Sequence, residues 1–554
     1  MSRLVTVALL GIGTAAAVAP PATAQAGPTA AEWREDLRFL AARLPVVHPN
    51  LFHHISKPEF EAAVARLDAR IPHLEPHQIL VELARLTALV GESHTGVLVS
   101  RQPRELLATL HGFPIRFHSF EDGLFVTAVD TAWAGAAGLR VVRIGAVAAS
   151  EALRRVGPII PADNPQWVRR HGPSHLAVAE VLHALEITPS RAELTLVLAD
   201  GAGAERSVTL SARPLPELSD YLNPLAEPPP RPNVAFARRS EPAPLWLRDQ
   251  RNRYWLTYLP ETRSLYLQIN VMLDKPEESL EQFFARALAL ADSLGPERFI
   301  IDIRQNNGGN NVALPLVHGL IRRPALNREG TLFVVIGFGT VSAGQHLATM
   351  LDLHTNAVFV GEPTASRPNH YGVVGAFSLP KSHVFVWYSR LLVQDSDPGD
   401  YRPWQPPDIA AALTSADYLR GGDPALEAIL AFRPLPPLAD SLDAAYSRGG
   451  LAAMREAYRA MATRYRETGR STERDLNRMG YMLLGRGKRK DAIAVFELNV
   501  QEHPSSFNVY DSVGDAYLRS GNRAAGLASY RRSVELNPGN EHAKRVLAAA
   551  VLDR

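Results

Sequence analysis

The sequence predicts a multidomain α/β protein in which helical segments lie at both ends of the chain. Three observations support this fold class. The chain has 554 residues, which is too many for one hydrophobic core at roughly 150 residues per domain. In the second half, strand patterns alternate with helical patterns of about 10–15 residues, which is typical of parallel crossover units. Near the C-terminus, similar residues recur 34 positions apart, as in helical repeats.

The composition is that of a globular protein, with 46% hydrophobic and 21% charged residues. Lys and Arg number 59 against 57 Asp and Glu, which gives a formal net charge of +2. This nearly neutral balance lacks the excess of basic residues that is typical of proteins that bind nucleic acid or an anionic membrane. The chain contains no cysteine, which excludes disulfides, a thiolate metal site, a lipoprotein anchor and a cysteine nucleophile.

Residues 1–24 are predicted to be a secretory signal peptide. They contain an early Arg3, an apolar run over 4–18 and the small-residue cleavage site Ala22-Thr23-Ala24. The run is too short to span a membrane, which takes about 20 apolar residues. An uncleaved N-terminal anchor is the less favoured alternative. We therefore expect a soluble mature protein that is secreted or periplasmic, with no stable membrane insertion.

Residues 25–100 are predicted to be helical, because Trp33, Leu37, Leu40 and Leu44 recur at helical spacing. Residues 101–212 are predicted to form a small α+β module with a helical stretch near 175–186. Its strands are expected in segments that alternate apolar and polar residues around turns, namely GLFVTAVD (123–130), LRVVRIG (139–145), AELTLVLAD (192–200) and ERSVTLSA (205–212).

Residues 213–247 are rich in proline and have no period, which favours a linker or an extended wrap over the surface. Residues 248–435 are predicted to form an α/β core with parallel strands. Its predicted strand segments are SLYLQINV (264–271), RFIIDIR (298–304), TLFVVIG (331–337) and AVFVG (357–361). A predicted helix over 279–294 separates the first two of these segments.

Residues 436–554 are predicted to form tetratricopeptide-like helical hairpins. Small residues inside the repeat and a proline at its end are typical of these units. Two such units have only marginal stability alone, so the helix over 451–465 and the last helix are expected to cap the stack. The pairs separated by 34 positions are Gly480 and Gly514, Leu484 and Leu518, Gly487 and Gly521, Phe496 and Tyr530, and Pro504 and Pro538.

A double-glycine turn, Gly308-Gly309, follows the predicted strand that ends in Asp302 and Arg304. Two glycines at the carboxyl end of a parallel strand let the backbone approach a ligand closely and present N–H groups to it. An ordinary glycine turn is the alternative interpretation.

Ser342 follows the next strand, in FGTVSAGQHLATML (338–351), and allows two interpretations. With Gln345 three positions later it matches a capping box, which is worth about 1 kcal/mol. It also lies at the tip of a strand-to-helix turn, where the helix dipole and free N–H groups stabilise an oxyanion. The pattern is not a G-x-S-x-G elbow, which argues against an α/β-hydrolase. One serine at a helix N-terminus can fill both roles.

A serine nucleophile needs a base, and His94 is the histidine best placed in the sequence. It lies in LVGESHTGVLVS (89–100), a polar, glycine-flanked break between a long helix and a β segment. The rivals are His346, His354 and His370. His346 is four residues beyond Ser342 in the same helix, which makes it an awkward base.

Taken together, these motifs resemble the tail-specific, or C-terminal-processing, serine proteases, a family that includes the tricorn core. The resemblance covers about 30–435, and the motifs occur in the family's order. The family's D-x-H-T motif resembles Glu92-Ser93-His94-Thr95, and its D-x-R-x-N-x-G-G motif resembles Asp302 to Gly309. Its S-A-x-E motif resembles Ser342-Ala343-Gly344-Gln345. Its G-E-x-T motif resembles Gly361-Glu362-Pro363-Thr364, and its P-D-I motif resembles Pro407-Asp408-Ile409.

The resemblance implies a serine endopeptidase with Ser342 as nucleophile and His94 as general base. One branch of the family uses a lysine base, but this chain has Arg367 at that position, and a guanidinium does not release its proton. The tricorn-like branch uses histidine with an auxiliary serine and a carboxylate. Ser93, beside His94, favours that branch.

The resemblance also implies the remaining parts of the site. The family's carboxylate shortly precedes the closing motif, and that spacing points to Asp400 ahead of Asp395 and Asp397. The implied oxyanion donors are the backbone N–H groups of Ala343 and of either glycine in Gly308-Gly309. No metal or cofactor is implied, and the sequence has no H-E-x-x-H.

In the family the α+β module is PDZ-like and captures peptide C-termini by adding a strand to a sheet edge. The catalytic core is crotonase-like, with ββα units and parallel strands. The expected substrate is a peptide or a protein. The helical tail is expected to bind a protein partner or to extend the substrate groove.

The alternative function is a catalytically silent family member that binds a peptide or a hydrophobic ligand, because a retinoid-binding photoreceptor protein shares the scaffold. Gln345 in place of Glu, Glu92 in place of Asp and Arg367 in place of Lys favour this alternative. The joint presence of Ser342, His94 and the double glycine favours catalysis. An esterase or glycan hydrolase on the same serine and histidine is a third, less favoured function.

Overall fold

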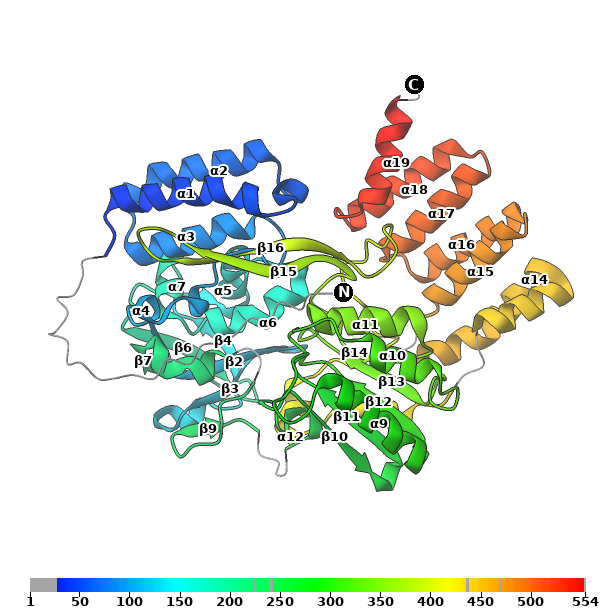
Figure 1. The fold of residues 1–554 in the computed structure, drawn as a ribbon, viewed down its shortest axis with the longest axis horizontal. Coiled ribbons are helices and arrows are strands. Elements are labelled where there is room, and N and C mark those ends of the chain that lie inside the picture. Colours follow the sequence, from blue (N-terminus) through cyan, green and yellow to red (C-terminus); the bar gives the residue numbers. More distant parts are fainter. Residues whose placement is uncertain (1–26, 224–225, 239–242, 435–437, 468–470, 553–554) are drawn as a thin grey trace, which may run out of the picture.

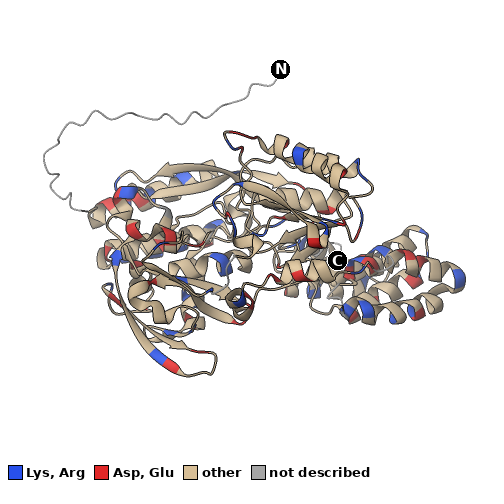
Figure 2. Cartoon of the chain, turned by 90° about the horizontal axis from the view of Figure 1, so that it is seen from below, with Lys and Arg blue, Asp and Glu red and all other residues tan. Residues whose placement is uncertain are grey.

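The computed structural model of the protein describes residues 27–223, 226–238, 243–434, 438–467 and 471–552. The predicted signal peptide lies outside these residues. Figure 1 shows N-terminal helices stacked on an α+β module, an α/β core beside the module, and a helical tail. Basic and acidic residues are interspersed over the molecule (Figure 2). None of the helices in the described part of the chain combines the length and apolar character needed to cross a membrane.

The N-terminal segment forms three helices, as its apolar period predicts: α1 (Ala30–Val47), α2 (Lys57–Arg70) and α3 (Pro76–Ala88). Capping boxes begin the first two, with Thr29 before α1 and Ser56 before α2. Leu37, Leu40 and Leu44 are fully buried along one stripe of α1. The turn that follows α3 carries His94.

The module contains an antiparallel sheet in the order β2-β3-β4-β6-β7. The four predicted strands are confirmed as β3 (Gly123–Asp130), β4 (Arg140–Ile144), β6 (Glu193–Ala199) and β7 (Glu205–Ser211). The edge strand β2 (Ile115–Phe120) precedes them. The helices α5 (Ala149–Val156), α6 (Pro165–His175) and α7 (Ala179–Ala184) lie between β4 and β6. Leu37 of α1 and Leu196 of β6 belong to one continuous hydrophobic core, so the N-terminal helices and the module are packed as a unit.

Short elements accompany the module. A helical turn α4 (Arg104–Leu107) precedes it, and β1 (His111–Gly112) pairs with β8 (Arg213–Pro214). The proline-rich segment contains α8 (Ser219–Leu222) and β9 (Val234–Phe236). Because β9 pairs with β3 and Trp246 is buried, the described part of this segment lies against the protein. β5 (Val147–Ala148) pairs with β4.

The core sheet has the order β10-β11-β12-β13-β14-β17. All neighbours are parallel except β10 and β11, so the predicted parallel strands are confirmed. The strands are β10 (Tyr254–Leu259), β11 (Ser264–Ile269), β12 (Arg298–Asp302), β13 (Leu332–Ile336), β14 (Val358–Gly361) and β17 (Ile409–Ala410).

Helices cover both faces of this sheet, because alternate residues of its strands point to opposite sides. Leu265 and Leu267 pack with α9 (Leu280–Leu294), α10 (Leu314–Ile321) and α11 (Ala343–His354). Tyr266 packs on the other face, in a cluster that includes Ile429 of α13 (Pro424–Ala431). A short helix α12 (Ser415–Arg420) precedes α13. The loops at the carboxyl ends of β12 and β13 carry the double glycine and Ser342.

A long hairpin of β15 (Asn369–Ser378) and β16 (Phe385–Gln394) forms a separate two-stranded sheet that no pattern in the sequence predicts. It leaves the core and runs along the N-terminal helices (Figure 1). Gly96 and Trp387 exchange backbone hydrogen bonds of 3.0 and 3.2 Å, and Lys381 N–H donates to Asp36 of α1 at 2.9 Å. The hairpin therefore joins the core to the N-terminal helices.

The tail contains α14 (Leu438–Glu467), α15 (Glu473–Gly485), α16 (Arg489–Glu502), α17 (Phe507–Arg519), α18 (Arg523–Leu536) and α19 (Glu541–Leu552). α15 and α17 begin 34 residues apart (507 − 473), as do α16 and α18 (523 − 489). The sequence period therefore corresponds to one pair of helices. An ion pair of 3.2 Å between Arg474 and Asp352 holds the tail against α11.

Candidate active site

Ser342 lies in a strained turn between β13 and α11. Its φ and ψ are 53° and −123°, in a region that side chains rarely adopt and that persists mainly at functional sites. Its hydroxyl makes no capping hydrogen bond to the helix. Its N–H donates to Ser366 Oγ at 3.3 Å. The strained backbone therefore holds a half-buried hydroxyl at the start of a helix without using it for capping.

The predicted capping box of Ser342 and Gln345 is wrong. An N-cap residue accepts hydrogen bonds from the first helical turn while its own backbone is extended, and the positive φ of Ser342 does not meet that condition. Gln345 is fully buried, and its Nε2 donates to Thr349 Oγ1 at 3.1 Å, one turn along α11.

Asn306 ties the double-glycine turn to the turn of Ser342. Its carbonyl accepts from Val341 N–H at 2.9 Å, and its side-chain Oδ1 accepts from Gly308 N–H at 3.0 Å. The predicted oxyanion donor Gly308 therefore has its N–H engaged. Among the described residues, the N–H groups of Gly309 and Ala343 donate to no acceptor outside their own elements, which leaves these two groups for an oxyanion.

Gly308 touches Ser342, and only glycine fits there. Its φ is 107°, and a Cβ added to it would lie 2.8 Å from Ser342 Cβ and 3.1 Å from Ser342 Oγ. We expect Gly308→Ala to lower the free energy of unfolding by about 1–3 kcal/mol. We also expect it to lower the rate of any reaction at the Ser342 hydroxyl by about 100-fold, because that hydroxyl must move. Urea unfolding measures the first effect, and labelling of Ser342 by a fluorophosphonate measures the second.

Gly295→Ala is the matched control for that substitution. Gly295 also has a positive φ, 54°, but it has nothing within 4 Å of an added Cβ. This variant is expected to lose stability while its activity is unchanged. Equal activity in the two variants would show that contact between Gly308 and Ser342 has no role in catalysis.

His94 is oriented by its Nδ1 atom. Ser93 Oγ lies 3.2 Å from Nδ1, and the N–H of His94 donates to Glu92 Oε2 at 2.6 Å. Burial raises the pKa of Glu92, but its contacts with His48, His94 and Thr95 outweigh burial and lower the pKa below its usual value. The anchored carboxylate fixes the turn, and the engagement of Nδ1 leaves Nε2 of His94 for proton transfer.

Asp163, a carboxylate that no sequence motif indicates, completes this arrangement. Asp163 Oδ2 accepts a short hydrogen bond from Ser93 Oγ and a second bond of 3.3 Å from Ser93 N–H. Asp163 belongs to the α+β module and immediately precedes Asn164, the N-cap residue of α6. Asp163, Ser93 and His94 therefore form a connected chain from a buried carboxylate to an imidazole.

Ser342 and His94 are 248 positions apart (342 − 94), and both contact the segment 366–370. Ser366 Oγ accepts from Ser342 N–H. Arg367 donates to the carbonyl of Asp163 at 3.3 and 3.2 Å. The His370 ring stacks on His94 with the ring centres 5.7 Å apart. Burial lowers the pKa of His370 below its usual value, and the neighbouring His94 lowers it further.

The predicted carboxylate Asp400 does not join this arrangement. Its carboxylate binds Arg402 at 2.7 Å and Ser396 Oγ at 2.7 Å, and Arg402 also pairs with Asp352 at the far end of α11. Burial raises the pKa of Asp400, but the contacts with Arg402 outweigh burial and lower it. The structure therefore shows Asp400 paired with an arginine, because a spacing in the sequence does not specify which residue a loop carboxylate meets.

A second histidine–carboxylate pair lies close to Ser342. His346 Nδ1 is 2.8 Å from Asp395 Oδ2, and each side chain is little exposed. His346 lies one turn beyond Ser342, and helical side chains lean back toward the N-terminus. Of the rival histidines, His346 and His370 therefore belong to the surroundings of the site, whereas His354 ends α11.

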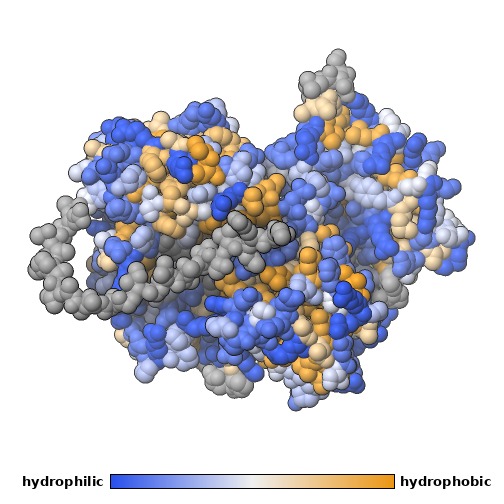
Figure 3. All heavy atoms as spheres, viewed as in Figure 1, coloured by the Kyte–Doolittle hydropathy of each residue, from blue (hydrophilic) through white to orange (hydrophobic). Residues whose placement is uncertain are grey.

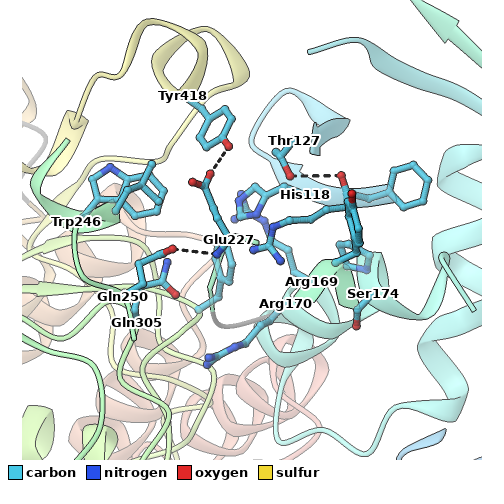
Figure 4. Close-up of a pocket in the computed structure, with 16 residues that line it drawn as sticks. His118, Thr127, Arg169, Arg170, Ser174, Glu227, Trp246, Gln250, Gln305 and Tyr418 are labelled. Carbon is cyan, nitrogen blue, oxygen red and sulfur yellow. Dashed lines mark hydrogen bonds between the residues drawn. The ribbon is translucent and has the colours of Figure 1, made fainter. Parts of the chain in front are cut away.

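An arginine-lined crevice lies between the module and the core (Figure 4). Arg170 donates to the carbonyl of Gly339 at 2.6 Å, just before the turn of Ser342. Arg169 pairs with Glu362 at 2.8 Å. Burial, followed by Arg116 and Arg169, lowers the pKa of His118 to about 3. Ser342 and His94 do not line this crevice, and its contacts fix the module against the core.

Within the described residues, no group of three or more His, Cys, Asp and Glu side chains is arranged to hold a metal ion. No family model and no curated protein matches the sequence.

Solved structures do match. Mature CPAF in complex with lactacystin gives a TM-score of 0.51 at 13% identity, over 72% of this chain and 97% of that one. A serine-to-alanine mutant of CPAF gives 0.52 at 13% identity, over 74% and 99%. The photosystem II C-terminal processing protease gives 0.31 at 14% identity, over 72% and 96%. The likeness to CPAF shows a shared fold, and it confirms at that level the resemblance that the motifs predict.

Proposed function

We propose that this chain is a serine endopeptidase in which Ser342 forms the acyl-enzyme and His94 is the general base. The observation that carries the proposal is the strained turn of Ser342, which leaves an uncommitted hydroxyl at a helix N-terminus. Strain of this kind is retained where function requires it. The fold shared with CPAF over most of the chain agrees with it.

The proposed mechanism is acyl transfer. His94 Nε2 takes the proton of Ser342 as its Oγ attacks the peptide carbonyl carbon, and the N–H groups of Ala343 and Gly309 stabilise the oxyanion. Ser93 and Asp163 hold Nδ1 and stabilise the imidazolium that forms. His94 then protonates the leaving amine, and water releases the acyl group by the reverse proton transfers.

Three departures from the family's motifs have structural roles. Arg367 binds the carbonyl of Asp163, Glu92 anchors the turn of His94, and Gln345 bonds to Thr349 within α11. Because Arg367 and Glu92 contact groups around His94, and Gln345 has a partner within its own helix, we do not take these departures as signs of a silent binding module.

Labelling by a fluorophosphonate tests the proposal, because only an activated serine forms the covalent adduct. Purified wild-type protein is expected to be labelled at Ser342, as located by mass spectrometry of the digested adduct. Ser342→Ala is expected to lose the label and His94→Ala to lose most of it. Labelling that persists in Ser342→Ala, or that never occurs in folded wild-type protein, contradicts the proposal and leaves the binding module as the function.

We extend the proposal to the rest of the chain. The module is proposed to be PDZ-like. Part of the β2 edge at which a peptide would pair is occupied by α6, because Arg169 Nε of α6 donates to the Ser119 carbonyl of β2 at 3.2 Å. The tail is proposed to be tetratricopeptide-like and to bind a protein partner. Residues 1–24 are proposed to direct export to the periplasm or the outside.

A further inference from the structure

His48 is a buried polar residue at the end of α1. It is the C-cap residue of that helix, and only 4% of it is exposed. The outer face of the N-terminal helices carries a mixture of hydrophilic and hydrophobic residues (Figure 3), but His48 lies beneath that face. A buried polar side chain costs free energy unless it has a partner. The partner of this imidazole therefore indicates what the residue does.

The imidazole of His48 is held in one orientation. Its Nδ1 accepts a hydrogen bond of 3.1 Å from the N–H of Asn50, so the proton of the neutral ring is on Nε2. Its Nε2 lies 3.4 Å from Glu92 Oε1. Tyr371 of β15 packs against the ring, with the ring centres 5.2 Å apart. These contacts keep the protonated nitrogen beside the carboxylate of Glu92.

Glu92 joins three segments that are distant in the sequence, and only 1% of it is exposed. Its Oε1 contacts His48 of α1 and accepts a hydrogen bond of 2.9 Å from Ser389 Oγ of β16. Its Oε2 accepts from the N–H of His94. Within the part of the chain that the structure describes, no lysine or arginine forms an ion pair with this carboxylate. Because a buried charge needs polar partners, the N–H of His48 is one of the groups on which the position of Glu92 depends.

We propose that His48 is a positioning residue for His94 and acts through the carboxylate of Glu92. This inference rests on the proposed function, because it concerns the general base. When the N–H of His48 is removed, the carboxylate loses its partner on α1, and the backbone of His94, which is bonded to that carboxylate, loses its fixed position. Displacing a catalytic group by about 1 Å can lower a rate by about 100-fold. His48 itself takes no part in the proton transfer.

Two substitutions of similar size separate this role from packing. His48→Gln keeps an N–H donor near the place of Nε2, whereas His48→Leu fills the site and has no donor. The rate at which a fluorophosphonate labels Ser342 is expected to fall by about 10–100-fold in His48→Leu. In His48→Gln the rate is expected to stay much closer to that of the wild-type protein. Equal losses in the two variants, or an unchanged rate in His48→Leu, overturn the proposal.

His77→Leu is the matched control. His77 is also a buried histidine of the N-terminal helices, at 6% exposed, but its Nε2 lies 2.9 Å from Nδ1 of His183. This variant is expected to lose stability in urea unfolding, as His48→Leu does, while the labelling of Ser342 is unchanged. If labelling falls as far in His77→Leu as in His48→Leu, general loss of stability explains the effect and the positioning role is overturned.

Hydrogen exchange separates this inference from the proposed function. The segment around His94 is expected to exchange with deuterium faster in His48→Leu than in wild type or His48→Gln, as measured by mass spectrometry of the digested protein. Faster exchange in His48→Leu without labelling of wild-type Ser342 removes the peptidase and leaves His48 as the residue that orders this turn. Labelling of the wild-type protein, with exchange that is the same in all three proteins, removes the positioning role and leaves the peptidase.

Discussion

Replacing Ser342 by alanine is expected to lower the rate of peptide hydrolysis by on the order of 10⁴–10⁶-fold, because the acyl-enzyme cannot form. The fold is expected to survive, because the Ser342 hydroxyl makes no capping bond that alanine would lose. We expect the free energy of unfolding to change by less than about 1 kcal/mol. Cleavage of unfolded casein measures the rate, and urea unfolding measures the stability.

Substitutions of His94, His354 and His346 serve as comparisons for Ser342→Ala. His94→Ala is expected to approach the loss seen for Ser342→Ala, because the two residues act as a unit. His354 ends helix α11, one helix length from Ser342, and His354→Ala is expected to retain activity. Full activity in His94→Ala with a loss in His346→Ala would transfer the role of base to His346.

Replacing Asp163 by asparagine is expected to lower kcat by about 10²–10⁴-fold with a smaller change in KM. The carboxylate bonds to Ser93, which contacts His94 Nδ1. Asparagine keeps the shape but loses the charge that stabilises the imidazolium. A purely structural role of Asp163 would appear instead as a loss of stability, which urea unfolding measures.

Asp400→Asn is the matched control for Asp163→Asn. Asp400 is bound to Arg402, so this variant is expected to lose some stability and to keep kcat within a few-fold. The reverse result, loss of kcat with Asp400→Asn and retention with Asp163→Asn, would restore the assignment that the sequence motifs imply and contradict the geometry.

The regular elements of this protein were predictable because each depends on residues close together in the chain. A buried strand such as β12 is an apolar run, and α1 has its apolar residues on one stripe. The hairpin β15–β16 was missed for the opposite reason. Its exposed apolar residues break the alternation that marks a half-buried strand, and its position depends on Gly96, far back in the chain.

The sequence by itself determined the strand-to-helix turn of Ser342, the double glycine and the break that carries His94, because motifs of a few residues specify local backbone. Only the tertiary structure decided which groups act on them. It left the Ser342 hydroxyl without a capping bond, bound Gly308 N–H to the side chain of Asn306, and placed Asp163 against Ser93 while Asp400 binds Arg402. The physical reason is that a buried polar atom takes whichever partner packing brings within about 3 Å. That partner can lie hundreds of residues away, where no local pattern records it.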